Sequence, residues 1–154
     1  MDLLLWRHAQ AADGTPDRER ALTARGHAQA RVVAAFLGPQ LPDGLRVLSS
    51  PARRARETAA ALGLEVEVVD GIAPDAAAAD LLAAAGWPGS GGAVMLVGHQ
   101  PTLGQCAALL LAGAEDDWHL AKGACWWLRA KRGAGRAGVR LVLAVGPKQL
   151  TPTG

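Results

Sequence analysis

Three apolar segments of this chain end in side chains that could bind a negatively charged group. The segments cover residues 3–6, 46–49 and 93–97. Each runs into cationic, hydroxyl or imidazole residues: Arg7 and His8 after the first, Ser50 and Arg54 after the second, and His99 after the third. Arginine and imidazole nitrogens donate hydrogen bonds to phosphate oxygens, and a neutral imidazole is also a nucleophile. The sequence therefore indicates chemistry on a phosphate group.

These side chains can meet only if the three segments are strands of one parallel sheet. In an open α/β sheet, ligands bind at the carboxyl ends of the strands. The helices that follow begin there too, and the free N–H groups at a helix N-terminus favour anions. A single histidine after a strand is more often an ordinary loop residue, so His8 or His99 alone carries little weight. Agreement among three strand ends favours a phosphate site.

Strands and helices alternate along the chain and predict an α/β fold. The other expected elements are helices over 22–38, 50–63, 76–85 and 102–113, a strand over 65–69, and strands over 124–130 and 139–145. The last two strands flank a Gly-rich basic turn, which is typical of a β-hairpin. We therefore expect a three-layer sandwich, with a mostly parallel central sheet between helices and an antiparallel hairpin at its C-terminal end.

Helical periodicity predicts the orientation of the helix over 50–63. Ser50 is expected at its N-cap and Pro51 at its first helical position. One stripe of the helix would be buried: Ala52, Ala55, Ala59 and Leu62. Arg54 then lies at the border of this stripe, within reach of the strand ends. Arg53 points to solvent, and a solvated surface is the ordinary expectation for Arg56 as well.

The helix over 22–38 has its own start and stop signals. Thr23 is a candidate N-cap, and Gly38 stands where a C-terminal glycine is common. The apolar residues predicted to share one face are Ala28, Val32, Ala35 and Phe36.

Length and composition set the class of protein. A chain of 154 residues, half of them apolar, is expected to form one domain over 1–154. Its net charge of +2 is too small to indicate nucleic acid or a membrane surface as partner. No apolar stretch reaches the roughly 18 residues that a membrane span needs. Cys106 and Cys125 form neither a disulfide framework nor a zinc pattern, so buried, reduced thiols in a cytoplasmic protein are expected.

The basic turn over 129–140 carries five Lys or Arg residues. A solvated hairpin tip is the ordinary interpretation of such a charge run. Docking to an acidic protein is the alternative. Nucleic-acid binding has little support, because no aromatic platform or known motif accompanies the charge.

Four motifs in order resemble the histidine phosphatase superfamily: RHA at 7–9, ALTARGHAQA at 21–30, SSPARRARETA at 49–59 and VGHQP at 97–101. The short chain and its closing segment are most similar to the small bacterial phosphohistidine phosphatases of that superfamily. The resemblance implies a phosphoglycerate mutase-like fold and no metal or other cofactor. It implies that His8 is a nucleophile that becomes phosphorylated, and that Arg7, Arg54 and His99 hold the phosphoryl oxygens. Ala9 departs from the superfamily's Arg-His-Gly.

The residue that would protonate a leaving group is not evident from the sequence. Asp17 and Asp70 are candidates, together with Asp13, Asp75 and Asp80, and none stands out. The expected substrate is phosphohistidine on a signalling protein, since a protonated imidazole leaves without much help. Small phosphorylated metabolites are the alternative substrates, and a non-catalytic phosphate-binding module is the alternative from another class. His27 and His119 are expected to be ordinary surface histidines.

Overall fold

The computed structural model describes residues 1–89, 91–131 and 138–151. The strands are β1 (Asp2–Arg7), β2 (Arg46–Ser49), β3 (Val66–Val68), β4 (Ala93–Gly98), β5 (Cys125–Ala130) and β6 (Val139–Val145). The α-helices are α1 (Ala24–Leu37), α2 (Arg53–Ala60), α3 (Ala78–Ala85), α4 (Thr102–Ala112) and α5 (Pro147–Leu150). Short 3₁₀ helices are η1 (Asp17–Glu19), η2 (Gly38–Gln40) and η3 (Asp70–Ile72).

The strands form one mixed sheet in the order β3-β2-β4-β1-β5-β6. β3, β2, β4 and β1 pair with one another in parallel, whereas β5 is antiparallel to both β1 and β6. The predicted α/β fold with a C-terminal antiparallel hairpin is confirmed. Because β4 lies between β1 and β2, the three strands that lead into the candidate site residues are neighbours in the sheet.

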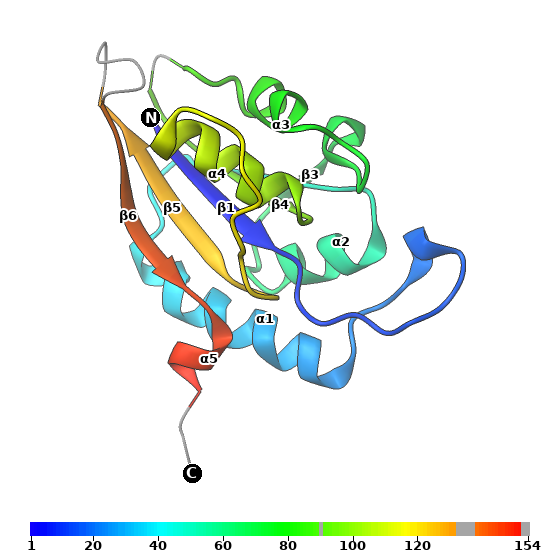
Figure 1. Cartoon of the computed structure of the whole chain (residues 1–154). Helices are drawn as coiled ribbons and strands as arrows, with labels where there is room; N and C mark the ends of the chain where they lie inside the picture. Colours follow the sequence, from blue (N-terminus) through cyan, green and yellow to red (C-terminus); the bar gives the residue numbers. More distant parts are fainter. Residues whose placement is uncertain (90, 132–137, 152–154) are drawn as a thin grey trace.

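Helices cover both faces of the sheet (Figure 1). Leu4 and Trp6 of β1 point into the core on one face, with residues of α1 and α2. Leu3 and Leu5 point into the core on the other face, with residues of α3 and α4. All four side chains are fully buried. The run of consecutive apolar residues in β1 therefore reflects a central strand that is buried on both sides.

Helix α1 begins as predicted but presents a different face to the core. The Thr23 hydroxyl accepts a hydrogen bond from the N–H of Gly26 at 2.9 Å, which confirms the N-cap. The predicted face is wrong, because Ala28, Ala35 and Phe36 are exposed and Val32 is half-buried. The buried residues are Gly26, Ala30, Val33, Ala34 and Leu37. Gly26 determines this rotation, since its bare Cα packs directly against the Gln10 backbone, where no side chain would fit.

Helix α2 is shorter than predicted but has the expected orientation. It begins at Arg53 with Ala52 as N-cap residue, so the expected start at Ser50 and Pro51 is wrong. The Ser50 hydroxyl accepts a hydrogen bond from the Ala52 N–H at 3.2 Å, but it belongs to the turn that links β2 to the helix. Arg54 is buried and Arg53 is exposed, as the helix phase predicts.

Other predicted features have mixed outcomes. Cys106 and Cys125 are buried free thiols. The central part of the basic turn, residues 132–137, lies outside the described residues, as does residue 90 in the turn before β4. Among the residues that the structure describes, no helix is long and apolar enough to cross a lipid bilayer.

Candidate active site

Backbone hydrogen bonds bring the three strand ends together. The His8 N–H donates to the Gly98 carbonyl at 3.0 Å, and the Ser50 N–H donates to the Val97 carbonyl at 3.0 Å. The rings of His8 and His99 lie with their centroids 5.2 Å apart. The structure thus places together the residues that the sequence predicted to converge.

His8 is held in one orientation and one protonation state. Its Nδ1 lies 2.8 Å from the Ala9 carbonyl oxygen, which can only accept, so Nδ1 carries the proton. Nε2 is then the nitrogen with a free lone pair. Burial, with smaller contributions from the adjacent Arg54 and Arg7, lowers the pKa of His8 to about 4. The imidazole is therefore neutral at pH 7, as a nucleophile must be.

Ala9 and Thr58 hold the backbone that orients the His8 ring. The Ala9 N–H donates to the Thr58 hydroxyl at 3.1 Å, and that hydroxyl donates to the Arg54 carbonyl at 2.7 Å. Thr58 and Ala9 are both fully buried. The methyl group of Ala9 packs in the core beside α2, so it occupies no space on the open side of His8. The sequence analysis did not identify Thr58. The feature that could have revealed it is a single hydroxyl residue on the face of α2 that is otherwise lined by alanines.

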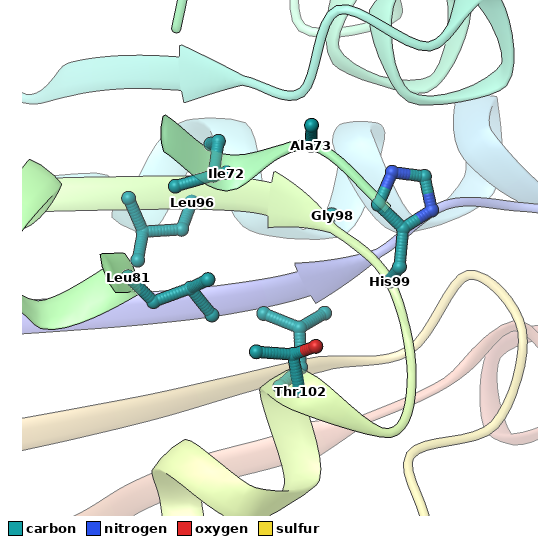
Figure 2. A pocket seen from close by; sticks show the side chains of 8 residues that line it. Ile72, Ala73, Leu81, Leu96, Gly98, His99 and Thr102 are labelled. Atoms are coloured by element: carbon teal, nitrogen blue, oxygen red, sulfur yellow. The ribbon is translucent and has the colours of Figure 1, made fainter. Parts of the chain in front are cut away.

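His99 stands at the end of β4 with one ring nitrogen available. Its Nε2 lies 2.8 Å from the Ser50 hydroxyl, whereas its buried Nδ1 has no hydrogen-bond partner in the described part of the chain. Burial and the nearby His8 lower the pKa of His99 to about 3. Figure 2 shows the ring beyond the end of β4, with one nitrogen turned away from the apolar side chains behind it.

Those side chains line a small apolar pocket behind His99, between β4, α3 and α4. Its lining residues include Ile72, Leu81, Leu96 and Leu103 (Figure 2). Since its walls are almost entirely hydrocarbon, the pocket supports the back of the His99 ring and keeps water from that side.

Arg7 is anchored at one end of its guanidinium only. One terminal nitrogen donates to the Leu120 carbonyl at 2.8 Å, in the loop between α4 and β5. Its Nε is buried and lacks a hydrogen-bond partner among the described residues. A buried N–H without a partner is costly, and it is typical of a position that a ligand completes.

Arg54 is the most deeply buried of the three arginines on α2. Only 5% of the residue is exposed. Its guanidinium donates to the Asp17 backbone carbonyl at 2.9 Å and to the Asp17 carboxylate at 3.1 Å. Arg53 instead lies on the exposed side, 3.6 Å from the carboxylate of Glu57.

The acidic candidates differ in position. Asp17 lies at the site, but hydrogen bonding to Arg20 and the proximity of Arg54 lower the pKa of its carboxyl group. An ionised carboxylate has no proton to give, which disfavours Asp17 as an acid. Asp70 begins η3 and is exposed, as are Asp13, Asp75 and Asp80. Within the described residues, no group of three or more His, Cys, Asp or Glu side chains is placed to hold a metal ion.

Comparison with known proteins identifies the class to which this fold and site belong. The sequence model of the histidine phosphatase superfamily (branch 1) matches residues 3–73. An uncharacterized protein from Picosynechococcus is 35% identical over 166 aligned positions, which cover 99% of this chain and 100% of the relative. The chain belongs to the histidine phosphatase superfamily.

Solved structures place it near one branch of that superfamily. A structure of the protein histidine phosphatase SixA complexed with tungstate has a TM-score of 0.83 at 25% identity, over 98% of this chain and 100% of that one. A protein from Nakamurella multipartita, assigned as the phosphohistidine phosphatase SixA, has a TM-score of 0.78 at 28% identity over 95% of both chains. The predicted resemblance to the small bacterial phosphohistidine phosphatases, based on the short chain and its closing segment, is confirmed.

Proposed function

We propose that this chain is a phosphatase in which His8 accepts the phosphoryl group. The observation that carries the proposal is the free Nε2 of His8 beside two buried nitrogens, Nε of Arg7 and Nδ1 of His99, that have no hydrogen-bond partner among the described residues. A tetrahedral oxyanion held between them would satisfy both nitrogens at once. Side chains fixed in advance around the oxygens are what stabilises a transferring phosphoryl group.

The reaction has two steps. In the first, Nε2 of neutral His8 attacks phosphorus, the bond to the leaving group breaks, and His8 becomes a phosphohistidine. In the second, water attacks the same phosphorus, the P–N bond breaks, and inorganic phosphate and neutral His8 are released. Arg7 and Arg54 offset the negative charge on the oxygens throughout. The Ser50 hydroxyl can donate to Nε2 of His99, which leaves the His99 proton on Nδ1 as a further donor.

The proposed substrate is phosphohistidine on a signalling protein. Two features support this choice over a small phosphomonoester. The proteins named SixA are described as protein histidine and phosphohistidine phosphatases. The carboxylate nearest the site, Asp17, is ion-paired rather than poised to protonate an alkoxide. A phosphoryl group on nitrogen needs less help of this kind, because a protonated imidazole leaves as a neutral ring.

The test compares substrates and traps the intermediate. Wild type should release phosphate from a protein phosphorylated on histidine much faster than from a panel of sugar and amino-acid phosphates. It should also carry an acid-labile, base-stable phosphoryl group after a rapid quench. His8→Ala should lose several powers of ten in rate and carry no label, while its thermal unfolding stays that of a folded protein. A variant that retains a tenth of the activity would refute the nucleophile, and faster turnover of a small ester would refute the substrate.

A further inference from the structure

We infer that Asp17 and Arg20 form an ion pair that positions Arg54 for phosphate and leaves its charge available. This inference rests on the proposed function and concerns residues to which sequence analysis gave either a different role or none. It reassigns Asp17 from candidate acid to positioning residue.

Asp17 binds the outer end of the Arg54 guanidinium. The backbone carbonyl of Asp17 accepts from one terminal nitrogen at 2.9 Å, and its carboxylate accepts from the other at 3.1 Å. In the described part of the chain, Nε of Arg54 makes no hydrogen bond. Asp17 alone therefore fixes both terminal nitrogens of the Arg54 guanidinium. The edge of the guanidinium that carries Nε is left for a phosphoryl oxygen, and the planar geometry of arginine suits such a contact.

Arg20 compensates for the charge of Asp17. One terminal nitrogen of Arg20 lies 2.9 Å from the Asp17 carboxylate, and its Nε donates to the Ala12 carbonyl at 2.8 Å. A lone carboxylate on Arg54 would cancel its charge and repel a phosphate dianion. With Arg20 on the other oxygen, the three groups keep one net positive charge. Arg20 also lies near enough to His8 to help lower its pKa, so this charge is felt in the site.

The contacts also hold the loop after β1. Figure 1 shows that this segment extends beyond the sheet before it returns to α1. Asp17 lies in η1, and its carboxylate is 59% exposed, whereas the Arg54 side chain is only 6% exposed. The exposed Asp17 carboxylate thus contacts the buried guanidinium of Arg54 from the loop after β1. The orientation of Arg54 therefore depends on that loop.

Tungstate binding measured by calorimetry tests the inference without requiring turnover. Asp17→Ala should weaken tungstate binding about tenfold, the loss expected for one charge-assisted hydrogen bond. Asp17→Asn, which keeps an acceptor for Arg54, should lose less. Arg20→Gln should weaken binding too, because Asp17 then neutralises Arg54 alone. The double variant Asp17→Ala/Arg20→Gln should resemble Asp17→Ala, since Arg20 acts through Asp17. Glu19→Gln, an exposed change in the same turn, is the matched control.

Each alternative has its own signature. Tighter tungstate binding by Asp17→Ala would mean that the carboxylate competes with phosphate, and would overturn the inference. Wild-type affinity in that variant would overturn it as well. Rates on aryl and alkyl phosphates separate positioning from acid catalysis: positioning lowers both equally, whereas loss of an acid falls mainly on the alkyl ester. If wild type itself binds no tungstate, the proposed function fails first.

Discussion

His8 and His99 face each other at the ends of two adjacent strands, with ring centroids 5.2 Å apart and ring planes inclined by 56°. They lie 91 positions apart in sequence, yet β1 and β4 place them side by side. Two imidazoles this close, beside two arginines, disfavour each other's protonation. Burial acts in the same direction, and it lowers the pKa of His8 to about 4 and that of His99 to about 3.

This pair makes stability depend on pH. Both histidines bind protons less readily in the folded chain than in the unfolded chain, whose ordinary value is 6.5. The unfolded state therefore takes up protons first as pH falls below about 6.5, and stability decreases from there toward pH 3. Urea unfolding of wild type at pH 7 and pH 4.5 should show this loss, and His99→Gln should lose less between the same two values. An unchanged difference in the variant would contradict the lowered pKa of His99.

Arg54 and Arg53 should differ sharply in activity. Arg54→Ala removes a buried cation beside His8 and should cost about 2–4 kcal/mol of transition-state stabilisation, as for other preorganised groups. Arg53→Ala removes an exposed side chain and should stay within about threefold of wild type, a change of less than 1 kcal/mol. The comparison is made on kcat/KM with one substrate. Equal losses would show that the orientation of α2 is not what governs phosphate binding.

Thr58 should influence His8 although it does not touch it. Thr58→Val keeps the shape of the side chain but leaves the buried Ala9 N–H without an acceptor, which should cost about 1–3 kcal/mol of unfolding free energy. The carbonyl of the same residue, Ala9, accepts from Nδ1 of His8, so kcat should fall more than KM changes. Thr58→Ser, which keeps the hydroxyl, should restore most of both. If the serine variant is as impaired as the valine variant, packing rather than hydrogen bonding explains the role of Thr58.

Gly26 in α1 and Gly38 at the C-cap of that helix should respond to alanine with opposite signs. At Gly26 a Cβ would overlap the Gln10 carbonyl, so Gly26→Ala should destabilise by about 1–3 kcal/mol, as overpacking usually does. At Gly38 the backbone is right-handed helical, with φ −46°, and a Cβ would meet no atom within 4 Å. Gly38→Ala should stabilise by about 0.4–1 kcal/mol. The urea midpoint should fall for Gly26→Ala and rise for Gly38→Ala relative to wild type, and a shift in the same direction for both variants would contradict the prediction.

The parts of the fold that local pattern determines were predictable. The β1 and β4 segments are continuous apolar runs, and such runs between helical segments indicate a parallel sheet. The burial of Arg54 followed from the 100° spacing of α2, because small residues left only one face that could pack. The convergence of three strand ends followed from the parallel order alone, without any knowledge of side-chain contacts.

The rest depends on contacts that no local pattern encodes. The rotation of α1 is set by Gly26 against Gln10, and apolar periodicity could not reveal a contact made by the absence of a side chain. Helix α2 begins at Arg53 rather than at Ser50, whose hydroxyl lies 2.8 Å from Nε2 of His99, a residue 49 positions away in sequence. Asp17 looked like a proton donor by residue type. Its pairing with Arg54 becomes visible only when the loop after β1 is placed over α2.

The position of β4 also governs when this protein can become active during synthesis. The strands nearest the N-terminus, β1 and β2, are not neighbours, because β4 separates them and pairs with both. In a nascent chain that has emerged only as far as β3, β1 and β2 therefore lack the strand that pairs with both of them, because β4 is synthesised later. His99 follows that strand directly. Closure of the sheet should therefore coincide with assembly of the candidate site, and a ribosome-bound first half is expected to lack that site.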